Sequence, residues 1–272
     1  MLAQLLSKAA TVAMLCFVVS SMLAIGAGLT VSQILEPLRN VRLVVLALLA
    51  NFVVMPLGAL ALAKVLGLDE PFGVGLLLLG CAAGAPFLPK LAELAKGNLA
   101  FAVGAMVLLM VVTVAYLPIV LPLLLPGVTV QPWDIARSLL LLMLLPLVIG
   151  LALKARYGDL AARVKPVLDW ISNISLILLI ALITAANVFG TLGILAGLLF
   201  IALGLVTGWL LGGSNTDTKR VMALGTGQRN IAAALVVATQ SFSDPKVVVM
   251  VIVVAIVGLI VLMPLSRALA SR

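Results

Sequence analysis

The sequence predicts an all-α membrane protein with about nine transmembrane helices. Of its 272 residues, 64% are hydrophobic and only 10% are charged, and the mean hydropathy is +1.35. Soluble domains are closer to half apolar and a quarter charged, so a water-soluble core cannot absorb this composition. Apolar runs of about 20 residues, the length that crosses a bilayer, recur along the chain. Lipid-exposed backbone must satisfy its own hydrogen bonds, so these runs must be helices.

Glycine, proline and charged residues divide the apolar runs into nine predicted spans. The spans cover residues 9–31, 42–66, 72–95, 98–125, 133–154, 166–188, 191–212, 218–241 and 246–268. The first run is long enough to span and no convincing cleavage site follows it, so we expect a retained helix and not a signal peptide. We expect one transmembrane domain over residues 1–272.

Basic residues fall mainly on one side of the nine spans. One side carries Lys8, Lys64, Arg137 and Lys246. The other carries Arg39, Arg42, Lys90, Lys96, Lys154, Arg156, Arg163, Lys165, Lys219, Arg220, Arg267 and Arg272. Cytoplasmic loops accumulate lysine and arginine, so we expect the N-terminus outside and the C-terminus in the cytoplasm. This role in topology accounts for the net charge of +8, and nucleic-acid binding is not expected.

Two spans are interrupted by helix-breaking residues. The third contains residues 80–90 (GCAAGAPFLPK), with Pro86 and Pro89, and the eighth contains residues 225–230 (GTGQRN). Proline removes a backbone donor and glycine adds freedom, so continuous helices are disfavoured there. The two interruptions occupy matching places in blocks of about 9–125 and 166–268. Inverted-repeat transporters bind substrate where such broken helices meet, whereas the alternative is a pair of kinks tolerated for packing.

Arg229, inside the second interruption, is the residue that points most clearly to a site. A guanidinium near the bilayer centre is costly, so it faces a cavity or a partner. We expect it either to hold a substrate carboxylate or to pair structurally. The candidate partners are Asn51 and Glu93, although Glu93 can pair instead with Lys90 one turn away.

Neighbouring polar residues complete the candidate substrate site. They are Thr226, Gln228, Asn230, Asn51 and Asn187, together with the helix-breaking Pro86 and Pro89. Alone, such side chains more often join helices than bind substrate. The chain has two cysteines and no histidine, so neither a disulfide framework nor a metal centre is expected. No catalytic motif is present either, and we expect no enzyme.

These motifs, in this order, resemble the bile acid:sodium symporter family. The resemblance covers nearly the whole chain. It begins at residues 26–30 (GAGLT) and continues with residues 51–56 (NFVVMP). Residues 95–100 (AKGNLA) are similar to the family segment A-[KR]-G-[ND]-x-A, and residues 225–230 to E-x-G-x-Q-N. The resemblance implies a small panel domain and a core domain with two crossing broken helices. It also implies alternating access for small carboxylates driven by two sodium ions.

The sequence departs from this family at the positions that the resemblance assigns to sodium. The family acid corresponds to Gly225 and its glutamine to Arg229. A serine–asparagine pair corresponds to Leu88 and Pro89, and later serine and threonine ligands correspond to Ala102 and Met106. Sodium needs several oxygen donors, and a fixed positive charge opposes a second cation. We therefore expect that sodium is not bound in the family's way and that the Arg229 guanidinium stands in for it.

The sequence favours a secondary-active or facilitative transporter of a small organic anion. Transport would then be uniport, exchange or proton-linked, with Glu93 as the candidate proton carrier. One alternative is a cation/proton antiporter, and another is a non-transporting membrane sensor or scaffold. A bacterial inner membrane is the expected location, because no organellar transit peptide precedes the first helix, and a processed plastid protein is the alternative. Substrate identity and oligomeric state are not readable from the residues.

Overall fold

The computed structural model describes residues 2–125, 131–186 and 191–271, and every regular element in those ranges is a helix. The all-α class is thereby confirmed. By length and composition, eight helical segments are suited to crossing a membrane, and the apolar helix α5 (Glu70–Cys81) is shorter. The exact count of nine spans and the inverted repeat stay predictions. Asn187, one of the candidate site residues, lies outside the described residues.

The bounds of the helices are as follows. The first half contains α1 (Leu2–Gly28), α2 (Val31–Leu35), the 3-10 helix η1 (Glu36–Arg39), α3 (Val41–Leu49), the π-helix η2 (Ala50–Val54), α4 (Met55–Val65), α5, α6 (Leu88–Leu94) and α7 (Leu99–Leu124). The second half contains α8 (Pro132–Leu139), the π-helix η3 (Leu140–Leu144), α9 (Leu145–Arg156), α10 (Gly158–Ala186), α11 (Thr191–Leu211), α12 (Thr216–Gly227), α13 (Ile231–Ser241) and α14 (Pro245–Ala270).

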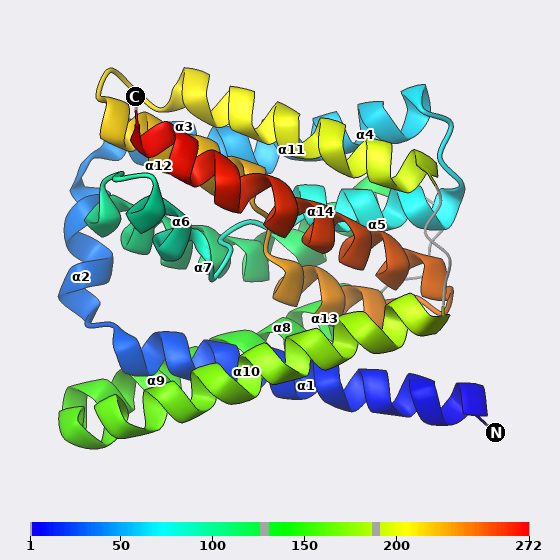
Figure 1. Cartoon of the computed structure of the whole chain (residues 1–272), viewed down its shortest axis with the longest axis horizontal. Coiled ribbons are helices and arrows are strands. Elements are labelled where there is room, and N and C mark those ends of the chain that lie inside the picture. Colours follow the sequence, from blue (N-terminus) through cyan, green and yellow to red (C-terminus); the bar gives the residue numbers. More distant parts are fainter. Residues whose placement is uncertain (1, 126–130, 187–190, 272) are drawn as a thin grey trace.

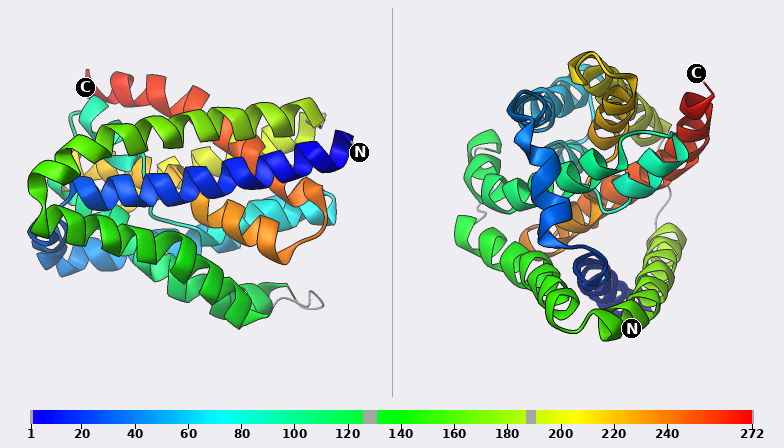
Figure 2. Two further views of the ribbon diagram at one scale, coloured as in Figure 1. Left: turned by 90° about the horizontal axis from the view of Figure 1, so that it is seen from below. Right: turned by 90° about the vertical axis from the view of Figure 1, so that its left-hand side faces the viewer.

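The helices form two groups (Figure 1; Figure 2). One group, which we call the panel, consists of α1, α9 and α10, and α1 packs along both of the others. The second group, the core, consists of α2 to α7 and α11 to α14. The helix α8 packs against the core helices α7 and α13 and continues through η3 into α9 of the panel. In the panel, α1 and α9 cross at Gly26 and Gly150, where a Cβ on either residue would meet the other's Cα at 2.9 Å.

Several basic segments gather at one end of the molecule. In Figure 1, α6, the turn between α9 and α10, and the C-terminus lie at that end together with the uncharged α2, and the N-terminus lies at the opposite end. The helix α10 begins at Gly158, eight residues before the predicted start, and passes through Pro166. The gap predicted between the spans that end at residue 154 and begin at residue 166 is therefore partly helical. A helix is possible there because Asp159 and Arg163 lie on its exposed surface, where their charges stay solvated.

Both predicted interruptions are confirmed. The first helix ends at Cys81, and the chain resumes helical structure at Leu88. Gly84 between them has φ +79°, which glycine adopts without a steric penalty, and a Cβ there would collide with the backbone of Met110 on α7. The second interruption is shorter, because α12 ends at Gly227 and α13 begins at Ile231. The two broken helices, α5–α6 and α12–α13, lie inside the core.

Candidate functional site

The two interruptions are joined to each other by hydrogen bonds from Asn230. Its backbone N–H donates to the Ala82 carbonyl at 2.9 Å, and its Nδ2 donates to the carbonyls of Ala83 and Gly84 at 3.2 and 3.1 Å. Its Oδ1 accepts from the Ala233 N–H at 3.0 Å and so caps the start of α13. One buried side chain therefore closes the second break and fixes it against the first.

Thr113 of α7 holds the first interruption from the other side. Its Oγ1 accepts from the Ala83 N–H at 2.9 Å and donates to the Ala83 carbonyl at 3.1 Å. The side chain is fully buried. Sequence reasoning missed this residue, although a threonine hydroxyl within the apolar fourth span was a usable signal. The backbone polar groups freed by the break thus gain partners within the protein, as membrane-depth backbone requires.

The Arg229 guanidinium lies where the broken helices meet, and its side chain is 2% exposed. Nε donates to the Leu79 carbonyl at 2.8 Å, and Nη2 donates to the Gly80 carbonyl at 2.8 Å. Nη1 donates to Asn51 Oδ1 at 2.6 Å and to the Thr226 carbonyl at 3.2 Å, and Nη2 also reaches the Asn51 carbonyl at 3.4 Å. An arginine has five N–H donors, so the protein itself occupies all of them.

Helix ends explain why these acceptors are available. Leu79 and Gly80 lie in the last turn of α5, and Thr226 lies in the last turn of α12. The last carbonyls of a helix lack intrahelical partners and carry the negative end of the helix dipole. Two such ends converge on one point, which is a good environment for a cation. The guanidinium occupies that point.

The π-helix η2 supplies the remaining acceptors. In this π-helix an N–H donates to the carbonyl five residues before it, as the Met55 N–H does to the Ala50 carbonyl. The donor for the Asn51 carbonyl would be residue 56, which is a proline and has no N–H. The Asn51 carbonyl is left open and accepts from Arg229. In an α-helix the N–H of residue 56 would donate to the Phe52 carbonyl, and Pro56 has no N–H to do so. Tyr116 Oη donates to that carbonyl instead, at 2.6 Å. Sequence reasoning missed η2 and Tyr116; Pro56 was the available signal.

Asn51 is the partner of Arg229, as predicted. Its side chain accepts from Arg229 through Oδ1, and its Nδ2 donates to Thr226 Oγ1 at 3.3 Å and to the Ala47 carbonyl at 3.0 Å. Glu93 instead forms an exposed ion pair with Lys90, with 2.8 Å between Oε2 and Nζ. Of the two alternatives for Glu93, the structure therefore shows the Lys90 pair. Its role as a proton carrier stays a prediction.

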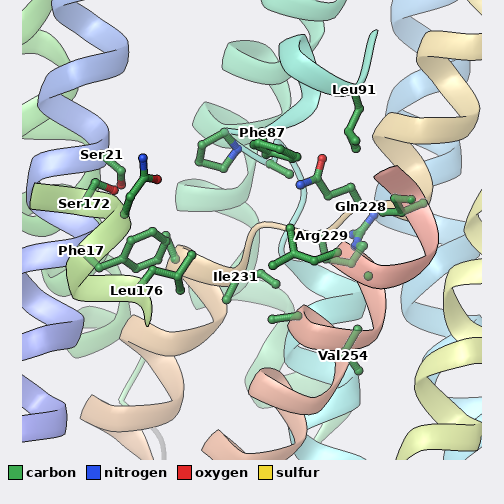
Figure 3. A pocket seen from close by; sticks show the side chains of 18 of the residues that line it. Phe17, Ser21, Phe87, Leu91, Ser172, Leu176, Gln228, Arg229, Ile231 and Val254 are labelled. Atoms are coloured by element: carbon green, nitrogen blue, oxygen red, sulfur yellow. The ribbon is translucent and has the colours of Figure 1, made fainter. Parts of the chain in front are cut away.

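A cavity of about 400 Å³ lies between the panel and the core, beside this crossover. Its walls are mainly apolar and come from α1, α10, α13, α14 and both interruptions. Pro86, Gln228 and Arg229 line it, whereas Pro89, in the first turn of α6, does not. Figure 3 shows Gln228 and Arg229 on one side and Ser21 and Ser172 on the other. Such a largely apolar cavity with few polar groups is typical of a ligand site.

Four of the positions that the resemblance assigns to sodium carry apolar side chains: Leu88, Pro89, Ala102 and Met106. Leu88 is 1% exposed and packs on Gly225, where an added Cβ would lie 2.9 Å from Leu88 Cδ2. Ala102 and Met106 are also buried. Among the described residues, no group of three or more histidine, cysteine, aspartate or glutamate side chains is placed to hold a metal. These side chains do not fit an oxygen-coordinated cation.

The AKGNLA segment forms the corner between α6 and α7. Lys96, with φ +51°, directly follows the C-cap residue Ala95 of α6, and the Asn98 side chain caps α7 by accepting from the Phe101 N–H at 2.9 Å. The corner is tied to α12, since Arg220 donates to the Lys96 carbonyl at 3.3 Å and Asn98 N–H donates to the Asp217 carbonyl at 3.3 Å. This motif therefore connects the outer ends of the two broken helices.

Comparisons with a family model and with individual known proteins point to the same family. The family model described as "Sodium Bile acid symporter family" matches residues 14–193. The chain is 27% identical over 239 residues to the "Uncharacterized sodium-dependent transporter YocS" of Bacillus subtilis (strain 168), covering 82% of this chain and 72% of that protein. It is 27% identical over 234 residues to the "Probable sodium/metabolite cotransporter BASS1, chloroplastic" of Arabidopsis thaliana, covering 83% of this chain and 58% of that protein.

A third relative is the "Probable sodium/metabolite cotransporter BASS2, chloroplastic" of Oryza sativa subsp. japonica, 25% identical over 241 residues, which cover 84% of this chain and 57% of that protein. The chain thus spans under two thirds of the length of these plant relatives. The matched family consists of transporters and not of enzymes. Because its model matches well over half of the residues, the chain belongs to the sodium bile acid symporter family.

Proposed function

We propose that this protein carries a small organic anion across the membrane, with the substrate bound in the cavity between the panel and the core. The supporting observation is the buried Arg229 guanidinium on the cavity wall, which no described carboxylate pairs with. Its charge is compensated only by carbonyl and amide dipoles. The field at that wall therefore favours an anion in the cavity over a cation.

We propose further that Arg229 takes the place of a coupling sodium ion. The acceptors it uses are the carbonyls of Leu79, Gly80 and Thr226 and both oxygens of Asn51. A sodium ion would need several such oxygens and would lie beside a fixed positive charge. The relatives are named sodium-dependent or sodium cotransporters, so this chain would differ from them in its coupling. Transport would be uniport, exchange or proton-linked, with Glu93 as the candidate proton carrier.

The proposed orientation places the C-terminus in the cytoplasm and the N-terminus outside. The support is the gathering of α6 with Lys90, the α9–α10 turn next to Lys154 and Arg156, and the C-terminus with Arg267 at one end of the molecule (Figure 1). Positive residues favour the cytoplasmic side, because translocating them is costly. A bacterial inner membrane remains the location we propose.

The experiment that tests this function is thermal unfolding of the detergent-purified protein with a panel of organic acids. Each acid is added with sodium and with potassium, because a ligand that binds the folded state raises the midpoint by mass action. We expect a carboxylate to raise the midpoint equally in both salts. A shift that requires sodium would contradict the replacement of sodium by Arg229. If no acid gives a shift, the organic-anion proposal is wrong and a sensor or scaffold is favoured.

A further inference from the structure

The second π-helix, η3, repeats the local pattern that frees two carbonyls at η2. The Leu145 N–H donates to the Leu140 carbonyl, five residues before it, and the next residue is Pro146. Because proline has no N–H, the Leu141 carbonyl loses its donor in the π register. The Leu142 carbonyl loses the donor that an α-helix would give it. Both π-helices are therefore followed by a break in their backbone hydrogen bonding.

The two π-helices differ in what binds the freed carbonyls. At η2, Arg229 donates to one carbonyl and Tyr116 donates to the other, and both carbonyls belong to residues buried in the core. At η3, no side chain in the described part of the chain donates to either carbonyl, and Leu141 is 49% exposed. Helices bend where prolines or π-bulges interrupt their hydrogen bonds. The helix is thus held in place at η2 and is free to bend at η3.

The π-helix η3 lies where one membrane span passes from the core to the panel. The span Pro132–Arg156 consists of α8, η3 and α9. Its first part, α8, packs on α7 and α13 of the core, and Ile135 and Leu139 are fully buried (Figure 1). Its last part, α9, packs on α1 of the panel, where the crossing of Gly26 and Gly150 leaves no room for a Cβ. The two ends of this span are therefore fixed to different groups.

Among the described residues, the chain makes one other passage between the two groups. The panel helix α1 ends at Gly28 and the core helix α2 begins at Val31, so the link consists of two residues outside a helix. Such short links between elements absorb large changes in φ and ψ. A helical span resists them, except where its hydrogen bonds are missing. Movement of the panel against the core would therefore bend the span Pro132–Arg156 at η3.

We infer that η3 is a hinge at which this span bends when the panel moves against the core. The open carbonyls of Leu141 and Leu142 let the two ends tilt without the loss of a hydrogen bond, and Pro146 keeps these carbonyls open. At η2 the same pattern gives no hinge, because Arg229 and Tyr116 bind its carbonyls. The inference rests on the proposed transport, which requires that the cavity open to either side of the membrane.

Hydrogen exchange of the unchanged protein in lipid nanodiscs compares the two π-helices directly. Mass spectrometry follows the peptides that cover residues 46–58 and 136–148, which contain η2 and η3 with their prolines at equivalent places. We expect the η3 peptide to exchange at least about tenfold faster, because its amides open locally at lower free energy. Equal rates would overturn the inference, and this comparison requires no variant.

The movement itself is measured as the distance between two spin labels by pulsed electron paramagnetic resonance. Asp159→Cys on the panel and Ser214→Cys on the core place labels at exposed positions. The exposed Cys16 is replaced by serine, and Cys81 is fully buried. Distances are recorded in nanodiscs without ligand and with each organic acid of the thermal-unfolding panel. We expect two distances, one for each state of the transporter, with proportions that an acid changes.

The variant Pro146→Ala tests whether the open carbonyls permit this movement. It restores an N–H that can donate to the Leu142 carbonyl. We expect the loss of one of the two distances and an about three- to tenfold slower exchange of the η3 peptide, as one added hydrogen bond allows. Pro264→Ala is the matched control, because Pro264 is an exposed proline inside α14, a helix of the core. This control should keep both distances.

The results separate the hinge from the proposed function. Two distances that persist in unchanged proportions in Pro146→Ala overturn the inference and leave organic-anion transport standing. Loss of one distance in Pro264→Ala as well also overturns the inference alone, because the effect would not belong to η3. If the unchanged protein gives one distance that no acid alters, and none of the acids enters liposomes that contain it, both the inference and the proposed function are wrong.

Discussion

At the scale of single residues, Arg229 organises the crossover. Sequence reasoning identified it and its partner Asn51 because both are polar residues within apolar runs, which is costly unless they meet. It did not foresee that backbone carbonyls would take most of the donors, since a carbonyl has no sequence signal of its own. For the same reason Tyr116 was missed, because its acceptor, the Phe52 carbonyl, becomes available only through Pro56.

Replacing Arg229 with glutamine should destabilise the protein in potassium by about 3 kcal/mol, because several buried acceptors lose their donor. Arg229→Lys keeps the charge and up to three donors, and should cost about half as much. Chemical denaturation followed by tryptophan fluorescence measures both values. Sodium should restore stability to Arg229→Gln and not to Arg229→Lys, because only the neutral variant leaves room for a cation. Equal behaviour of the glutamine variant in both salts would contradict the stand-in role.

Tyr116→Phe should lower the free energy of unfolding by about 1 kcal/mol, since the Phe52 carbonyl loses its donor in a water-poor environment. Tyr157→Phe is the matched control, because Tyr157 is 59% exposed, and it should have no effect. The same denaturation assay compares the two variants. If both variants unfold like the unchanged protein, the Tyr116 hydrogen bond does not support the π-helix.

At the scale of elements, the two broken helices were predictable and their exact geometry was not. Proline and glycine in residues 80–90 and 225–230 indicate the interruptions directly. The ends of other helices depend on whether their charged side chains can stay in contact with solvent. The start of α10 was placed too late because charged residues such as Asp159 and Arg163 resemble a loop in sequence, although they are solvated on a helix surface. The packing of Leu88 on Gly225 likewise depends on two segments far apart in the chain.

A double-mutant cycle tests that packing. Gly225→Ala places a Cβ 2.9 Å from Leu88 Cδ2, so it should destabilise the protein by about 1 kcal/mol. Leu88→Ala removes a buried side chain and should cost about 2–5 kcal/mol. The double variant should lose about 1 kcal/mol less than the sum, because the small residue at 88 makes room for the new methyl group. Strict additivity would show that the two breaks do not pack through this pair.

At the scale of the whole molecule, hydropathy was enough to predict an all-α membrane protein. The division into panel and core was expected only from the family resemblance, because it depends on which apolar helix packs on which, and their apolar faces look alike in sequence. The structure shows α1, α9 and α10 packed together and a cavity between them and the core. Movement of these two groups relative to each other would expose that cavity to either side, as alternating access requires.

The measurement that tests the central claim most directly is uptake of a labelled monocarboxylate into liposomes that contain the purified protein. The acid is the one that stabilises the protein most, and its initial rate is compared under an inward sodium gradient and an equal potassium gradient. We predict the same rate in both salts, because in our proposal the Arg229 guanidinium, bonded to the Leu79 and Gly80 carbonyls, takes the place of a coupling sodium ion. Uptake that occurs only with sodium would contradict this account and would identify an ordinary sodium symporter.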